Sequence, residues 1–297
     1  MSEAAIGPEI DPEIGYVVEK LGRGLYLINN GAYQMMFLTT GEGLIVVDAP
    51  PFIGSKILEA IATVTDEPIT HVIYSHSHND HIGSASLYPD GVEIIAHEET
   101  AAHLVKKNDP NRPIPTRTFS DELTLTVGTQ TLKLTYNGLN HTPGNIYIYA
   151  LEQKVLMLVD IIFPGWTPFE DLAIAESVAG FLEAHDVALS YDFDYFIGGH
   201  QSRYGTRQDV ETQKAYFNDT LVAAEKANAA MDFGAALIEA EARGGKGNPW
   251  VYVKIMLDKV TAQCAAEVEK KWSDRLGGVD IYTYSHCWEI TGHQRVD

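Results

Sequence analysis

Four side chains that commonly bind metals lie close together in the segment Ser-His-Ser-His-Asn-Asp-His at residues 75–81. The preceding residues 70–74 are rich in β-branched and aromatic side chains and predict a strand that ends at this segment. In an extended chain, His76 and His78 point to the same side, roughly 6–7 Å apart, and can bind one cation together. Asp80 and His81 follow the strand end and can face a second cation. Two adjacent metals predict a hydrolytic site.

Three further ligand-type residues lie at turns or strand ends later in the chain. His141 lies in the turn Asn-His-Thr-Pro-Gly between two strand-like segments, and Asp160 ends the apolar run 155–159. His200 ends the strand-like run 196–199. Strand ends of a layered α/β protein converge on one edge, where ligands bind. We therefore expect all seven side chains to meet in one site.

With these residues in this order, residues 16–205 resemble the metallo-β-lactamase superfamily, and Val46-Val47-Asp48 resembles the family's early strand-end aspartate. The resemblance implies an αββα sandwich of the α/β (α+β) class, which agrees with strands followed by a helix, repeated twice. It also implies two Zn²⁺ ions that share a hydroxide nucleophile, although the same ligands accept Fe, Mn or Co. The implied ligands are His76, His78 and His141 for the first metal, Asp80, His81 and His200 for the second, and Asp160 as the bridge. Asp80 would also orient the nucleophile or transfer a proton, so Asp80 and Asp160 are the candidate catalytic residues.

The resemblance leaves several activities open because many reactions share this site. An aspartate at position 160, instead of cysteine or serine, points away from the strict β-lactamases, so ester or lactone cleavage is the first expectation. Alternatives are a thioester hydrolase of the glyoxalase II type and a β-lactam hydrolase. A different class, the mononuclear iron persulfide dioxygenases, would use only His76, His141 and Asp160. A binding protein without activity is disfavoured because the full ligand set is present.

Two short segments next to the ligands are candidates for the substrate pocket. The loop 163–169 follows Asp160 directly, so Trp166 and Phe169 could form an apolar wall. Arg203 and Tyr204 come just after His200 and could contact substrate or an oxyanion.

Composition limits the range of partners. The net charge of −20 would repel a phosphate backbone, so we expect a small-molecule substrate and no nucleic acid. No apolar run approaches 18 residues, so we expect no membrane span. The first ten residues lack the basic and apolar regions of a signal peptide, and the two cysteines do not suggest a disulfide framework. We therefore expect a cytoplasmic protein.

The resemblance, and the change after His200 to segments rich in Ala, Glu, Lys and Leu with helical spacing, divide the chain into two parts. Residues 1–206 would form the metallo-β-lactamase-like domain, and residues 207–297 a helical extension packed on it, which could also form a homodimer contact. The expected helices are 54–64, 98–107, 171–188, 207–242 and 250–272, and the expected strands fall within 16–50, 70–74, 93–96 and 118–149.

Overall fold

The computed structural model describes residues 2–296, and its first half is built on a seven-stranded sheet. The strands follow one another in chain order, antiparallel from β1 to β4 and parallel from β4 to β7. Their bounds are β1 (Val17–Gly22), β2 (Leu25–Asn29), β3 (Gln34–Thr39), β4 (Leu44–Val47), β5 (Ile69–Ile73), β6 (Glu93–His97) and β7 (Arg117–Phe119). Every residue of β4 is buried. Its sequence is a continuous apolar run, without the alternation of apolar and polar residues that a strand with one exposed face shows.

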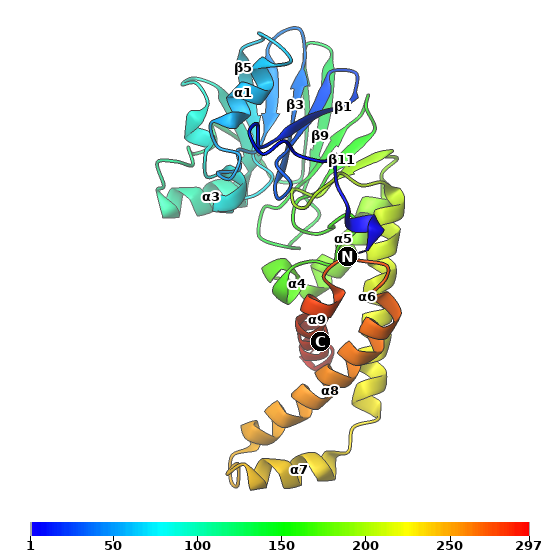
Figure 1. The fold of residues 1–297 in the computed structure, drawn as a ribbon. Coiled ribbons are helices and arrows are strands. Elements are labelled where there is room, and N and C mark those ends of the chain that lie inside the picture. The colour runs from blue at the N-terminus through cyan, green and yellow to red at the C-terminus, as the bar shows by residue number, and fades with distance from the viewer. Residues whose placement is uncertain (1, 297) are drawn as a thin grey trace.

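A second sheet of five strands packs face to face with the first (Figure 1). Its order is β12-β11-β10-β9-β8, formed by β8 (Glu122–Val127), β9 (Gln130–Thr135), β10 (Tyr147–Ala150), β11 (Val155–Met157) and β12 (Tyr195–Ile197). Ile45 and Val47 of the first sheet share one buried cluster with Leu134 and Ile148 of the second. The central core therefore lies between the sheets.

Helices cover both outer faces of this sandwich. Ile57 of α1 (Lys56–Ala62) and Leu104 of α3 (Glu98–Lys107) pack with Val72 on the first sheet. Phe181 of α5 (Val178–Ser190) packs with Leu156 on the second. The short elements are the helix α2 (Asn79–Ile82) and the 3₁₀ turns Glu3–Ala5 and Ala85–Leu87. The predicted α/β sandwich with C-terminal helices is thus confirmed.

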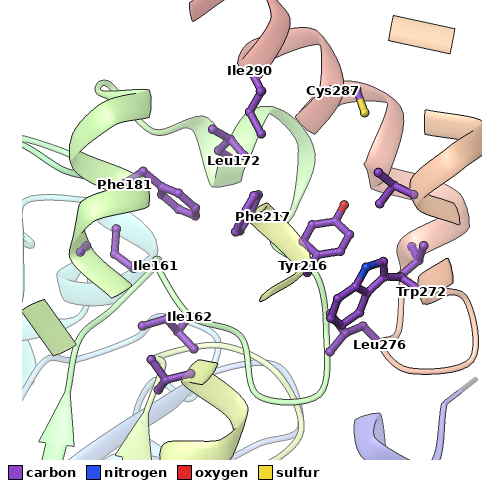
Figure 2. Close-up of a cluster of buried hydrophobic side chains, with 14 of the residues drawn as sticks. Ile161, Ile162, Leu172, Phe181, Tyr216, Phe217, Trp272, Leu276, Cys287 and Ile290 are labelled. Carbon is purple, nitrogen blue, oxygen red and sulfur yellow. The ribbon is translucent and has the colours of Figure 1, made fainter. Parts of the chain in front are cut away.

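The chain after the sandwich forms long helices, part of which projects away from the sheets (Figure 1). They are α6 (Arg207–Ala229), α7 (Phe233–Ala242), α8 (Pro249–Trp272) and α9 (Val279–Val296), with α7 at the far end and α9 beside the sandwich. Phe217, Trp272 and Ile290 of this extension pack in one buried cluster with Phe181 of the sandwich (Figure 2). Within residues 2–296, no helix is both long and apolar enough to cross a bilayer.

The two cysteines form a disulfide, so the expectation that they would not is wrong. Cys264 of α8 and Cys287 of α9 are bonded with their Cα atoms 6.0 Å apart, and both are fully buried. Cysteines on two separate helices pair only because folding packs those helices together, which their spacing in the sequence does not reveal.

The predicted continuous helix over residues 171–188 is also wrong. Only α5, from Val178, is a regular helix there, and its N-cap Ser177 accepts a hydrogen bond from Gly180 N. The preceding element α4 (Glu170–Ile174) has left-handed backbone angles, with φ between 52° and 57° from Asp171 to Ile174. Helical periodicity in the sequence carries no sign of handedness, and contacts with α9 hold the segment in this form.

Buried neutral histidines predict a loss of stability in acid. Burial lowers the pKa of His286 on α9 to about 4, below the ordinary histidine value of about 6.5. The unfolded chain therefore binds the extra proton first, and stability falls as the pH drops from about 6.5 to about 4, by about 3 kcal/mol for this residue. Urea unfolding at several pH values measures the free energy of unfolding of the wild-type chain and of His286→Asn. The difference between the two should become smaller as the pH falls across this range. His103→Asn, on the exposed side of α3, is the control and should show a much smaller change. A pH-independent difference for His286→Asn would contradict the prediction.

Candidate metal centre

The His-x-His-x-Asp-His motif lies where a parallel strand meets a short helix. β5 ends at Ile73, His76 and His78 follow in the connecting segment, and α2 begins at Asn79. Asp80 and His81 therefore lie in the only turn of α2 and face a different direction from the two earlier histidines. The change from extended to helical backbone lets one short segment serve two ligand clusters.

The other candidate ligands come from loops at the same edge of the sandwich. Asp160 follows β11 with φ of 62°, in the left-handed region. The loop that carries His200 follows β12 and is tied to the first sheet, since Gln34 N donates to Gly199 O at 2.8 Å. Gly199 has φ of 83°, and a Cβ there would lie 3.2 Å from Cε1 of His81. Glycine is therefore needed where this loop passes the site.

The structure brings all seven predicted ligands into two neighbouring clusters. In each cluster the ligand atoms lie within 4.8 Å of one another. Asp160 joins them, because its Oδ2 lies 3.2 Å from Nε2 of His141 in one cluster and 3.2 Å from Nε2 of His81 in the other. The first cluster holds His76, His78, His141 and Asp160, and the second holds Asp80, His81 and His200.

Burial and the two carboxylates set the charges in these clusters. Burial lowers the pKa of His78 to about 4 and that of His76 as well, so both stay neutral near pH 7. Burial also opposes charge on His200, but Asp160 and Asp80 outweigh it and raise the pKa of His200 to about 9. Although burial acts in the opposite direction, His81 and His200 hold the pKa of Asp160 well below its usual range. The anionic carboxylate is thus surrounded by imidazoles.

The ring nitrogens of the two clusters are placed better for binding a metal than for contacting one another. Nδ1 of His78 lies 3.1 Å from Nε2 of His141, and the Nε2 atoms of His81 and His200 are 2.9 Å apart. Nε2 of the fully buried His76 has no hydrogen-bond partner. Ring nitrogens that point at each other, or that lie without a hydrogen bond as Nε2 of His76 does at 3.4 Å from Oδ2 of Asp160, are costly to bury unless a cation takes their lone pairs. Imidazole and carboxylate are also the donors that zinc and related metals prefer.

Asp48 supports the first cluster from behind. Its Oδ1 accepts a hydrogen bond from Ser75 N at 2.8 Å, and Oγ of Ser75 lies 3.0 Å from Nδ1 of His76. Burial raises the pKa of Asp48 to about 6, and its φ is 66°. Such contacts fix the orientation of a ligating imidazole.

The two clusters form the floor of an open pocket of about 260 Å³. Of the four pocket residues suggested by the sequence, Phe169 lines it. Trp166 instead donates its indole N–H to Ala5 O at 3.2 Å and packs on Gly277. Arg203 is paired with Asp209 at 2.6 Å, and Tyr204 packs against Tyr195. The last three are absent from the pocket lining because these neighbours hold their side chains elsewhere.

Several lining residues were not among the sequence candidates. Tyr33 lines the pocket, with its ring 4.5 Å from that of His200 and its hydroxyl donating to Oδ2 of Asp80 at 3.4 Å. Burial, with Asp80 and Asp160, raises the pKa of Tyr33 to about 12, so the hydroxyl keeps its proton. Tyr33 lies directly before β3, and no spacing rule in the sequence relates it to the histidines. Glu170, Ala173 and Ile174 of α4 complete the wall.

Comparison with known proteins agrees with this geometry. The family model described as the metallo-beta-lactamase superfamily matches residues 29–224. The chain belongs to the metallo-β-lactamase superfamily. It is therefore an enzyme of a metallohydrolase family, with a His/Asp cluster suited to metal.

Individual relatives are distant and match only part of the chain. The 2,4-dinitroanisole O-demethylase subunit alpha of Nocardioides sp. (strain JS1661) is 26% identical over 68% of this chain and 62% of its own length. A type 2 metallo-beta-lactamase of Elizabethkingia meningoseptica is 28% identical over 54% of this chain and 67% of its own. The solved metallo-beta-lactamase from Pontibacter korlensis has a TM-score of 0.58 at 19% identity, covering 67% of this chain and 97% of that one, which supports the fold. The chain thus spans less than two thirds of the demethylase subunit.

Removing the shared carboxylate should weaken metal binding. Asp160 contacts histidines of both clusters, so Asp160→Ala should lower metal affinity. Changing a residue that only supports a metal ligand costs at least about tenfold in affinity, and we expect a loss of at least this size here. Elemental analysis after dialysis against a competing chelator measures the metal retained per chain. Asp66→Ala, at an exposed loop carboxylate, is the control and should match the wild-type chain. Equal metal retention in Asp160→Ala would argue against this centre.

Proposed function

We propose that this chain is a dinuclear zinc hydrolase that cleaves esters or lactones. The observation that carries the proposal is the pair of ligand clusters that share Asp160 on the floor of one open pocket. Two adjacent dications need several neutral donors and a bridging anion, and the five imidazoles and two carboxylates provide both.

In this proposal each cluster holds one ion. His76, His78 and His141 would bind the first zinc, Asp80, His81 and His200 the second, and Asp160 would contact both. When bound, two zinc ions supply a nucleophilic hydroxide near neutral pH and polarise the substrate carbonyl. Asp80 faces the pocket, half-buried, where it can accept a proton from the nucleophile and return it to the leaving oxygen. Tyr33 donates to Asp80 and keeps that carboxylate oriented toward the pocket.

The site also favours this reaction over the main alternative. A mononuclear iron dioxygenase would use only His76, His141 and Asp160. The second cluster, Asp80, His81 and His200, would then have no role, although its imidazoles are buried and converge on Asp160. The demethylase relative is named for an aryl methyl ether, so aryl esters are the first substrates to test.

Activity and metal content together test the proposal. Protein produced with balanced zinc and iron should contain about two zinc ions per chain and hydrolyse phenyl butyrate or a simple lactone. Asp80→Asn should lower kcat by about 10²-fold or more, because it removes the proton acceptor. Asp66→Asn, with the same change at an exposed carboxylate, should leave kcat unchanged. About one iron per chain, with oxygen consumed in the presence of a persulfide, would instead establish the dioxygenase.

A further inference from the structure

An apolar wall, formed by Phe169, Ala173 and Ile174, lines the pocket beside the ligand clusters. The ring of Phe169 lies 5.1 Å from that of His200, and the ring of Tyr33, which also lines the pocket, lies 4.5 Å from it. The side chain of Ile174 is 66% exposed, and the ring of Phe52, 69% exposed, stacks on Tyr33 at 4.8 Å. Large apolar side chains exposed beside a pocket favour a ligand that covers them.

The charged groups of the pocket lining, apart from its imidazoles, are all carboxylates. They belong to Asp80, Asp160 and Glu170, and no lysine or arginine lines this pocket among the described residues. Two arginines, Arg203 just after His200 and Arg112 beside Ser77, are held by other groups. Arg203 pairs with Asp209, and Arg112 pairs with Asp109 and donates to Ser77 O. A carboxylate on the part of a substrate away from the metal ligands would therefore be desolvated without a cationic partner.

The wall is held in place by the C-terminal extension. Four successive left-handed residues, Asp171 to Ile174, cost roughly 1–2 kcal/mol each in backbone energy, so the surroundings must hold them. Asp171 N donates to Oγ of Ser285 at 2.9 Å, and Nε2 of His286 donates to Phe169 O at 3.0 Å. Leu172 is buried near Ile290 and Phe217, so it fixes the wall to the core (Figure 2).

Three features together indicate one substrate class: the apolar surface of the pocket, the absence of lysine and arginine from its described lining, and the fixed wall. We infer that, given the proposed hydrolase function, this pocket selects uncharged esters or lactones with an apolar, aryl-type group against the α4 wall, and rejects substrates that carry a carboxylate there. Glu170, at the exposed edge of the wall, adds a like charge that strengthens this rejection. Selection of this kind would exclude most anionic acyl compounds even though the reactive centre is generic.

A matched pair of esters tests the inference on the zinc-loaded protein. Phenyl butyrate and 3-carboxyphenyl butyrate differ in one carboxylate away from the reacting carbonyl. We expect kcat/KM to be about tenfold or more higher for the uncharged ester. Glu170→Lys should reduce this ratio several-fold by favouring the anionic ester. Glu225→Lys makes the same change in net charge on the exposed side of α6 and should leave the ratio unchanged.

A binding measurement separates this inference from the proposed reaction. The Kd values of N-phenylbutanamide and its 3-carboxy derivative, measured by calorimetry, report recognition without turnover. If the uncharged amide binds more tightly but neither ester is hydrolysed, the inference about the pocket is supported. The proposed hydrolase function is then contradicted. Equal or better binding or hydrolysis of the carboxylated compound would overturn the inference. Binding of neither amide, with neither ester hydrolysed, would overturn it as well.

Discussion

The carboxylate of Asp160 is the group on which the site depends. It is buried, ionised, and 3.0–3.2 Å from histidines of three separate segments, which are helix α2 and the loops that carry His141 and His200. One negative charge in this position makes it possible to bury several imidazoles side by side, because the Nε2 atoms of His76, His81, His141 and His200 lie 3.0–3.4 Å from its oxygens. The left-handed backbone at Asp160 turns this side chain into the site immediately after a buried strand.

The two sheets provide the rigidity that this arrangement requires. Ligands that follow β5, β11 and β12 begin from strands whose last residues, Ile73, Met157 and Ile197, are fully buried in the central core. Loops tied to such strands can hold side chains accurately, as the bonds from Gln34 N to Gly199 O and from Ser75 N to Asp48 show. Metal affinity and fold stability are therefore linked through the same backbone segments.

The C-terminal extension has a second role beside completing the core. Through Ser285, His286 and Leu172, helix α9 fixes the short left-handed element that forms one wall of the pocket. The ligand set at the floor is common to a large family, while the wall of α4 is held in place by the additional helix α9. Specificity can therefore change in the extension without changing a metal ligand.

The sequence alone determined the sandwich and the positions of all seven ligand-type side chains. Their types and spacing follow strand ends, and strand ends of such a fold meet at one edge. Tertiary structure alone decided the pairing of Cys264 with Cys287, the place of Tyr33 in the pocket, and the displacement of Arg203 and Trp166 from it. It also decided the left-handed turn at 171–174, where helical periodicity predicted a right-handed helix. Each of these depends on contacts between segments far apart in the chain, and local patterns carry no information about such contacts.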